Sequence, residues 1–156
     1  MKRTAKDILQ EKGGHLVTAS SDATVYQALT IMTQNKVGAI VVVEDDKIVG
    51  IWTERDLMFR ALEEGFDPKT ARLSDNMSVN LISANVNDTA YQLYDKFLGR
   101  RIRHLLIEES GDYIGILSVG DVMRANLQQA TEELQQLNEM VSLEYYENWK
   151  EVQATR

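Results

Sequence analysis

Two short stretches of this 156-residue sequence carry the same polar residues at the same spacing. In GIWTERDL and GILSVGDV, a hydroxyl residue, Thr53 or Ser118, is followed three positions later by an aspartate, Asp56 or Asp121. A hydroxyl and an acid at this spacing can form a capping box at a helix start. A helix start also attracts anions, and a carboxylate can accept hydrogen bonds from two neighbouring hydroxyls. The motif therefore has two interpretations: a helix cap alone, or a site for a sugar diol and a phosphate.

The identity of the acid bears on the choice between these interpretations. Capping boxes favour Glu or Gln at the third position, where the side chain reaches back to the amide of the capping residue. This sequence places the shorter Asp there in both copies. We expect Asp56 and Asp121 to reach their own caps less well and to project outward. The choice of residue therefore favours a binding role.

The two stretches close two copies of one internal repeat. Sliding the sequence on itself by 65 residues aligns 17–62 with 82–127 without a gap, and ten of the 46 pairs are identical. Most other pairs in the apolar runs exchange one aliphatic residue for another, as in Val17 and Ile82. Sustained self-similarity at a fixed spacing indicates a duplicated structural unit.

Each copy carries the same order of secondary-structure signals. A short apolar run at 16–19 or 81–84 predicts a strand, and apolar residues with a helical period after a cap-type Asp or Thr predict a helix. Two Val- and Ile-rich runs separated by EDDK or ESGD then predict a hairpin, and a second helix opens at the motif. The predicted unit is β-α-β-β-α. Each unit has one apolar sheet face, so we expect the two halves to pack on each other.

Composition and charge argue against several functional classes. A net charge of −7 is unfavourable for a nucleic-acid surface, because phosphate neutralisation needs a basic face. The sequence has no cysteine, and its two histidines are too few for a histidine-rich metal site. The start of the sequence has no apolar core of signal-peptide length, and the apolar run at 37–43 is far too short to span a bilayer. No catalytic arrangement of Ser, His and Asp and no glycine-rich phosphate loop stands out. We predict a soluble, cytoplasmic, non-enzymatic protein that binds neither metal, nucleic acid nor membrane.

The sequence after the second motif predicts one long helix. Residues 121–150 contain neither Gly nor Pro, and Leu127, Leu134 and Val141 recur every seven positions. Two interpretations remain open, because the helix either packs on its own domain or extends to pair with a partner chain. Aromatic residues near its end add apolar surface and favour the second interpretation. The other apolar residues on which this pattern depends are Ala130, Leu137, Tyr145, Tyr146 and Trp149.

The duplicated unit, with G-h-h-[ST]-x-x-D-h closing each copy (h, apolar), resembles a pair of cystathionine-β-synthase-type domains, the CBS domain pair. The resemblance covers roughly 4–128. It implies an α+β fold in which two β-α-β-β-α repeats pack with pseudo-twofold symmetry, with an extended C-terminal helix outside them. We place the first repeat at 1–66, the second repeat at 67–128 and the terminal helix at 129–156.

The resemblance also implies two ligand clefts between the repeats. In the family such clefts bind adenosine-bearing ligands such as AMP, ADP, ATP, S-adenosylmethionine or NAD, and the pair usually regulates another protein without performing chemistry. Matching positions assign Thr53 and Asp56 to one cleft, and Ser118 and Asp121 to the other, for phosphate and ribose. The residues that the resemblance assigns to the adenine are Ile82, Ile102, Arg103 and His104 in the cleft of Thr53, and Val17, Val37, Gly38 and Ala39 in the cleft of Ser118.

The two clefts are expected to differ in charge. The cleft of Thr53 gathers Arg55, Arg103 and His104, with Arg100 and Arg101 close in sequence. Forked arginine contacts suit a ligand with two or three phosphates, although cations also suit the solvated C-terminal end of a helix. The cleft of Ser118 offers the uncharged residues Gly38, Ala39, Val119 and Gly120. It suits a nucleoside with little charge, a sulfonium compound or no ligand.

These observations predict two functions of different classes. The first is a regulatory module that senses an adenine nucleotide and passes its occupancy, through the geometry of a homodimer, to an unidentified protein partner. The second is an interaction or scaffold protein with empty clefts, which acts through its terminal helix and dimer surface. Removal of residues 129–156 separates the two, because a sensor keeps its ligand whereas a scaffold loses its partner.

Overall fold

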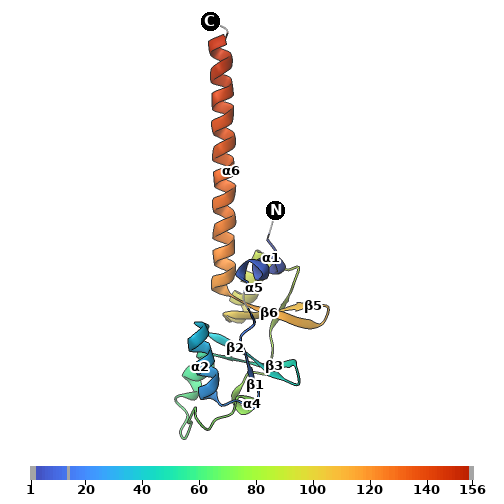
Figure 1. Cartoon of the computed structure of the whole chain (residues 1–156), viewed down its shortest axis with the longest axis vertical. Coiled ribbons are helices and arrows are strands. Elements are labelled where there is room, and N and C mark those ends of the chain that lie inside the picture. Colours follow the sequence, from blue (N-terminus) through green and yellow to red (C-terminus); the bar gives the residue numbers. More distant parts are fainter. Residues whose placement is uncertain (1–2, 14, 155–156) are drawn as a thin grey trace.

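The computed structural model describes residues 3–13 and 15–154, with side chains described as far as residue 143. Two structural halves are stacked beneath one long helix (Figure 1). In chain order the elements are α1 (Ala5–Lys12), β1 (Thr18–Ser20), α2 (Val25–Asn35), β2 (Ala39–Glu44), β3 (Lys47–Thr53), α3 (Glu54–Arg60), α4 (Leu73–Asn76), β4 (Ser83–Asn85), α5 (Ala90–Arg100), β5 (His104–Glu109), β6 (Asp112–Ser118) and α6 (Val119–Ala154).

Each half contains one three-stranded sheet, and the two sheets have the same topology. In the first sheet β1 pairs in parallel with β2, and β2 pairs antiparallel with β3; β4, β5 and β6 repeat this order. The register also repeats, since Thr18 lies opposite Val41 and Ser83 lies opposite Leu106, each 65 positions further on. The predicted duplication and the α+β fold are therefore confirmed.

The hairpin turns explain why both copies place polar residues between their last two strands. Asp45 and Asp46 have φ angles of 47° and 59°, and Ser110 and Gly111 have 55° and 91°. Two consecutive residues with positive φ are typical of a type I′ turn, whose twist matches that of the flanking strands. Asp and Gly tolerate this conformation better than β-branched residues do.

The helix starts are defined by side-chain caps in both halves. Thr24 caps α2 and Thr89 caps α5, and in each case a glutamine three residues later bonds back to the capping amide. Both helices end at a basic residue in the left-handed conformation, Lys36 with φ 54° and Arg101 with φ 52°. The same local signals therefore give the two helices the same length and position relative to their sheets.

The helices α1 and α4 are exchanged between the halves. The amides of Ala5 and Lys6 in α1 donate to the carbonyls of Asp88 and Val86, at 2.7 and 2.9 Å, in the second half. The amide of Leu73 in α4 donates to the carbonyl of Ala23 at 2.9 Å, in the first half. Each short helix thus precedes one repeat in sequence and packs on the other.

The motif glycines make room for these exchanged segments. A Cβ on Gly50 would overlap the sulfur of Met77, which follows α4, and a Cβ on Gly115 would lie 2.7 Å from a methyl of Leu9 in α1. Real Cβ atoms do not approach so closely, so a larger residue at either position displaces the side chain of Met77 or Leu9. The glycine of the motif therefore serves packing.

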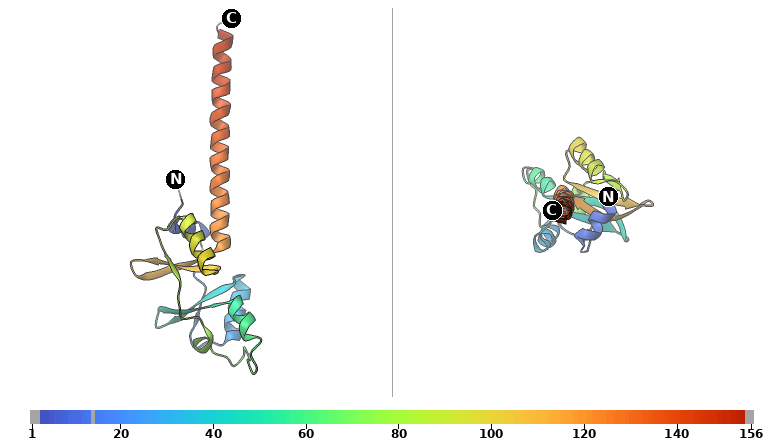
Figure 2. Two further views of the ribbon diagram at one scale, coloured as in Figure 1. Left: turned by 180° about the vertical axis from the view of Figure 1, so that it is seen from behind. Right: turned by 90° about the horizontal axis from the view of Figure 1, so that it is seen from above.

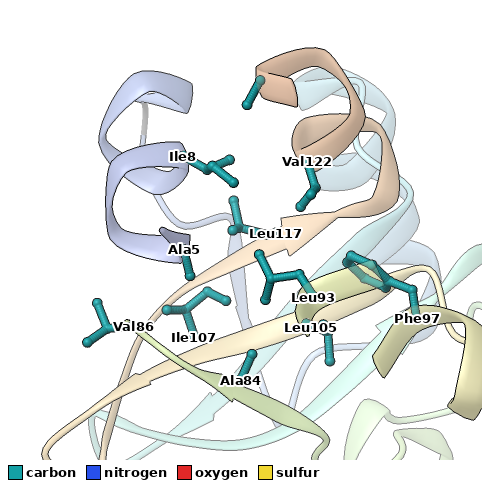
Figure 3. Close-up of a cluster of buried hydrophobic side chains, with 11 residues drawn as sticks. Ala5, Ile8, Ala84, Val86, Leu93, Phe97, Leu105, Ile107, Leu117 and Val122 are labelled. Carbon is teal, nitrogen blue, oxygen red and sulfur yellow. The ribbon is translucent and has the colours of Figure 1, made fainter. Parts of the chain in front are cut away.

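Each half has its own hydrophobic core. Figure 3 shows the second core, where Ala5 and Ile8 of α1 face Leu117 and Ile107 of the sheet, with Leu93, Phe97 and Val122 around them. The first core contains the fully buried Trp52 and Leu73 with Ile40, Val42 and Met32. Trp52 stands where the second repeat has Leu117, and its indole nitrogen has no hydrogen-bond partner among the described residues.

The last helix, α6, is 36 residues long, or about 54 Å at 1.5 Å per residue. Its first turns pack on the second half, and the remainder extends away from the body in both side views (Figures 1 and 2). Leu127, Leu134, Leu137 and Val141 on this helix are between 57 and 65% exposed. Within the described chain no helix is long and apolar enough to cross a bilayer. The aromatic residues predicted to extend the apolar stripe lie beyond the described side chains.

Candidate ligand-binding clefts

The first cleft opens where the end of β3 and the start of α3 face the second half. Its volume is about 400 Å³. The residues predicted for the cleft of Thr53 all line it: Thr53, Arg55, Asp56, Ile82, Ile102, Arg103 and His104. Arg100 and Arg101, expected close by, are not among its lining residues. The predicted residues therefore come together from three segments that are distant in sequence: the motif, the start of the second repeat and the entry to β5.

The arginines of the first cleft already have partners in the protein. Arg103 forms an ion pair with Glu54 at 3.0 Å, and both side chains are well exposed. The guanidinium of Arg55 donates to the carbonyl oxygen of Arg101 at 2.8 Å, which ties the first half to the second. The charges of Arg55 and Arg103 are thus balanced by those of Glu54 and Asp56 in the same cleft.

The second cleft lies at the pseudo-symmetric position, between the start of α6 and the first half. Its volume is about 370 Å³. The residues predicted for the cleft of Ser118 all line it: Val17, Val37, Gly38, Ala39, Ser118 and Asp121. His104 lines this cleft as well as the first one. The thirteen predicted residues therefore lie in the two clefts to which the sequence assigns them.

The prediction that the second cleft is uncharged is wrong. Lys12, Lys36 and Arg124 line it with His15, whereas Val119 and Gly120 do not. These basic residues come from α1, from the left-handed residue that ends α2, and from the second turn of α6. Lys36 directly precedes Val37 in sequence and was omitted from the predicted set, whereas Lys12 lies on α1, which the fold brings beside this cleft.

The motif residues form complete capping boxes, contrary to the expectation that Asp would reach its cap poorly. Asp56 Oδ2 accepts from the Thr53 amide at 2.9 Å, and Asp121 Oδ2 accepts from the Ser118 amide at 2.8 Å. In return the amides of Asp56 and Asp121 donate to the motif hydroxyls at 3.4 and 3.1 Å. Each cap uses Oδ2, so the cap itself does not occupy Oδ1, which in Asp121 lies 3.7 Å from Arg124. The capping and binding interpretations are therefore compatible.

Asp121 has a different environment from Asp56. Burial alone would raise the pKa of Asp121, but hydrogen bonds from the Ser118 amide and from Lys12 outweigh it and hold the pKa below its ordinary value. Lys12 Nζ lies 3.0 Å from Asp121 Oδ2, and Arg124 lies 3.7 Å from Oδ1. The carboxylate is therefore ionised at neutral pH and contacts two cations.

His104 lies between the two clefts, and its side chain is uncharged at neutral pH. Burial lowers the pKa of His104 below its ordinary value. The nearby cations Lys12 and Arg103 act in the same direction, while Glu54 and Asp121 oppose them. The imidazole can therefore offer one donor and one acceptor to a ligand, and it adds no positive charge.

Sequence reasoning missed one segment in each cleft. Ser78, Asn80 and Leu81 line the first cleft, and Gly13, His15 and Leu16 line the second. Both segments directly precede the first strand of a repeat. Extending the 65-residue offset upstream relates 13–16 to 78–81. Applying the same offset to these upstream residues could have identified both segments.

A cluster able to hold a metal ion is not found among the described residues, since no three His, Cys, Asp or Glu side chains converge there. The polar side chains that line the two clefts carry hydroxyl, carboxylate, amide, imidazole and cationic groups. This donor set suits a polar organic ligand with hydroxyl and anionic groups.

Comparisons with known proteins agree with the fold and the repeat. A model of the CBS domain matches residues 5–63 and 72–128. A mitochondrial CBS domain-containing protein of Arabidopsis thaliana, CBSX3, is 35% identical over 144 residues, which cover 86% of this chain and 70% of that protein. The crystal structure of a CBS-domain containing protein from Agrobacterium tumefaciens is 35% identical, with a TM-score of 0.75, over 81% of this chain and 95% of that one.

More distant structures share the fold and contain ligands. A CBS domain protein of Pyrobaculum aerophilum is complexed with AMP; it is 23% identical, with a TM-score of 0.67, over 76% of this chain and 89% of that one. The CBS domain pair of protein MJ0100 is in complex with 5′-methylthioadenosine and S-adenosyl-L-methionine; it is 20% identical, with a TM-score of 0.71, over 83% of this chain and 99% of that one. At these identities the likeness extends to the fold alone.

Proposed function

This chain belongs to the CBS-domain family, and we propose that it is a regulatory module that binds an adenosine-containing ligand in the clefts between its two repeats. The observation that carries the proposal is the composition of the clefts. Each combines the hydroxyl and aspartate that begin a helix in one half with the first-strand segment and hairpin entry of the other half. A ligand in either cleft therefore contacts both halves at once.

The proposed roles follow from the hydrogen-bonding capacity of each group. Oδ1 of Asp56 or Asp121 accepts from the ribose hydroxyls, while Oδ2 keeps the helix cap intact. Main-chain groups at Ile102 and Val37 hold the adenine edge, and the half-buried apolar side chains beside them contact its faces. AMP in one distant relative and S-adenosyl-L-methionine in another have the adenosine moiety that these groups suit.

A ligand screen tests this proposal. Purified protein, shown by mass spectrometry to be free of carried-over ligand, is heated with AMP, ADP, ATP, NAD, S-adenosylmethionine or 5′-methylthioadenosine. A ligand at a hundred times its Kd stabilises the fold by about 2.7 kcal/mol, which shifts the Tm measurably. Calorimetric titration of each ligand that shifts the Tm then measures Kd and stoichiometry.

Two variants locate the binding. Asp56→Ala should abolish the Tm shift of a first-cleft ligand, and Asp121→Ala should abolish that of a second-cleft ligand. Each shift is compared with the same variant without ligand, because loss of the cap lowers the Tm by itself. A shift that survives in both variants would contradict the proposed clefts, and the absence of any shift in the wild type would contradict adenosine sensing.

We further propose that the module forms a homodimer through α6. Nothing in the described residues covers the apolar stripe of Leu127, Leu134, Leu137 and Val141 beyond the body. Heptad spacing suits a two-stranded coiled coil. The positions beside the stripe from 126 to 140 carry one charge, Glu133, although the protein is acidic. Two copies of this helix can therefore pair in parallel without opposing like charges.

Sedimentation of the full chain tests this pairing. Leu134→Glu places a charge on the stripe and should convert the dimer to a monomer or weaken it at least tenfold. Gln136→Glu adds the same charge on another face of α6 and should leave the dimer intact. A dimer that persists in Leu134→Glu would show that another surface holds the copies together.

The two functional classes predicted from the sequence also separate in this variant. If the protein is a sensor, Leu134→Glu retains ligand binding in the clefts but no longer passes occupancy to a partner. If it is a scaffold, no ligand binds in either form and the loss of pairing removes its function. We propose the sensor, with an unidentified protein partner. The absence of catalysis and the cytoplasmic location remain predictions.

A further inference from the structure

The two clefts have similar volumes and matching motifs but different charges. In the first cleft Arg55 and Arg103 are balanced by Glu54 and Asp56. In the second cleft Lys12, Lys36 and Arg124 face one carboxylate, that of Asp121. The uncharged His104 lies between them and does not change this balance. The second cleft therefore has an excess of two positive charges in a protein whose net charge is −7.

The positive charge of the second cleft is only partly neutralised within the protein. Lys12 contacts Asp121 at 3.0 Å and also donates to the carbonyl of Ile116 at 3.0 Å. Arg124 lies 3.7 Å from the same carboxylate, with its side chain 77% exposed. Lys36 is exposed at the cleft and forms no ion pair with a described residue. Two cations thus share one carboxylate, and a third has none.

We propose that the second cleft is the polyphosphate site and selects a nucleoside di- or triphosphate over the monophosphate and the uncharged nucleoside. This inference rests on the proposed binding of adenosine compounds. The ribose hydroxyls bond to Oδ1 of Asp121, and the phosphates take Lys36, Arg124 and Lys12 as their counter-charges. The first cleft, which is lined by as many carboxylates as arginines, takes the ligand of lower charge.

The position of these cations links the second cleft to the long helix. Lys12 belongs to α1 and Arg124 to α6, so the proposed phosphates contact both helices. The same two helices are joined by Arg3, which bonds to Glu11 at 2.6 Å and to Glu132 at 3.3 Å. The first cleft has no lining residue in α6. A polyphosphate in the second cleft would therefore act on the base of the helix that we propose to pair.

Calorimetric titration of the full-length protein with adenosine, AMP, ADP and ATP tests the assignment. In wild type the affinity should rise with each added phosphate, and the affinity for ATP should fall when the salt concentration is raised from 50 to about 200 mM, because exposed charges are screened. Lys36→Ala should weaken ATP binding roughly tenfold and adenosine binding less than twofold. The Lys36 side chain has no ion pair with a described residue to lose, so this variant should fold normally.

Two further variants identify the cleft. Lys47→Ala removes an equal charge from the first hairpin, away from both clefts, and should leave ATP binding unchanged. Arg103→Ala removes a cation of the first cleft and should weaken ATP binding less than threefold. A tenfold loss in Arg103→Ala with no loss in Lys36→Ala would overturn the assignment in favour of the first cleft.

The outcomes also separate this inference from the proposed function. If adenosine and AMP bind as tightly as ATP and Lys36→Ala has no effect, the polyphosphate assignment is wrong while adenosine sensing stands. If none of the four compounds binds ligand-free wild-type protein, and S-adenosylmethionine and NAD also fail, both proposals are wrong.

Discussion

The two halves of the molecule have the same strand register and helix caps. Their clefts differ in charge, because different neighbouring segments line them. Ser118 and Asp121 repeat the cap geometry of Thr53 and Asp56 to within about 0.3 Å. The second cleft nevertheless gains basic residues from α1 and α6, whereas the segment preceding β4 brings only uncharged residues to the first. Duplication therefore preserves the framework, and the neighbouring segments set the chemistry of each cleft.

The cores should show the largest difference between the halves. Trp52→Ala should lower the free energy of unfolding by roughly 3–5 kcal/mol, because a fully buried indole leaves a large cavity. Leu117→Ala, at the matching position, should cost less, at the lower end of roughly 2–5 kcal/mol. Urea unfolding monitored by circular dichroism measures both, with Trp52→Phe as the control. Equal losses for Trp52→Ala and Leu117→Ala would show that the halves pack more alike than their residues indicate.

The motif glycines should be the next most sensitive positions. Gly50→Ala and Gly115→Ala should each cost roughly 1–3 kcal/mol, because the added Cβ displaces Met77 or Leu9. Gly50→Ala should be the more costly, since its Cβ would approach the neighbouring side chain more closely. Thermal unfolding of both variants is compared with Gly99→Ala, whose Cβ meets nothing within 4 Å and should stabilise α5 by roughly 0.5 kcal/mol. Unchanged stability in Gly50→Ala would mean that the exchanged segment adapts freely.

The caps should respond equally in the two halves. Thr53→Ala and Ser118→Ala each remove a hydroxyl that accepts a helix amide, and each should cost about 1 kcal/mol. Thr53→Ser retains the bond and serves as the control for loss of the hydroxyl. Equilibrium unfolding distinguishes the variants. A cost near zero at one site would mean that its hydroxyl does not stabilise the helix start, so that the two motifs would not be equivalent as caps.

The smallest expected effect comes from a residue that only the second half has. His104 occupies the position of Ala39, and burial lowers its pKa below the unfolded value near 6.5. The unfolded chain therefore binds the proton more readily, so stability is fully present above pH 6.5 and falls as the pH drops through the depressed pKa. His104→Ala should flatten the decline in Tm between pH 7 and 5. An identical decline in the variant would assign it to the carboxylates instead.

Much of this architecture could be predicted from the sequence because the signals are local and occur twice. Cap residues such as Thr24 and Thr89 begin helices, and Val- and Ile-rich runs flank turn residues in both copies. The offset of 65 residues then relates each position of one cleft to a position of the other. The thirteen predicted cleft residues came together because they lie at strand ends and helix starts, which this topology brings together.

The charge of the second cleft could not be predicted in the same way. Lys12 lies on α1, and nothing in an eight-residue amphipathic segment specifies which of two similar sheets it covers. Lys36 is itself the left-handed residue that ends α2, and it lines the second cleft, whereas Arg101 at the matching position does not line the first. Side-chain length alone does not predict that Asp56 and Asp121 reach their caps, because the backbone geometry of the turn also sets this distance.

The exchange of α1 and α4 has a consequence for the origin of the chain. A single ancestral repeat, carrying its own preceding helix, would leave its sheet uncovered and its helix without a partner. Two such chains would complete each other by trading these arms, as domain-swapped dimers do. Fusion of the two copies would turn that exchange between chains into contacts within one chain. The present protein is then equivalent to a swapped dimer joined in one polypeptide, in which a substitution in one half is not repeated in the other.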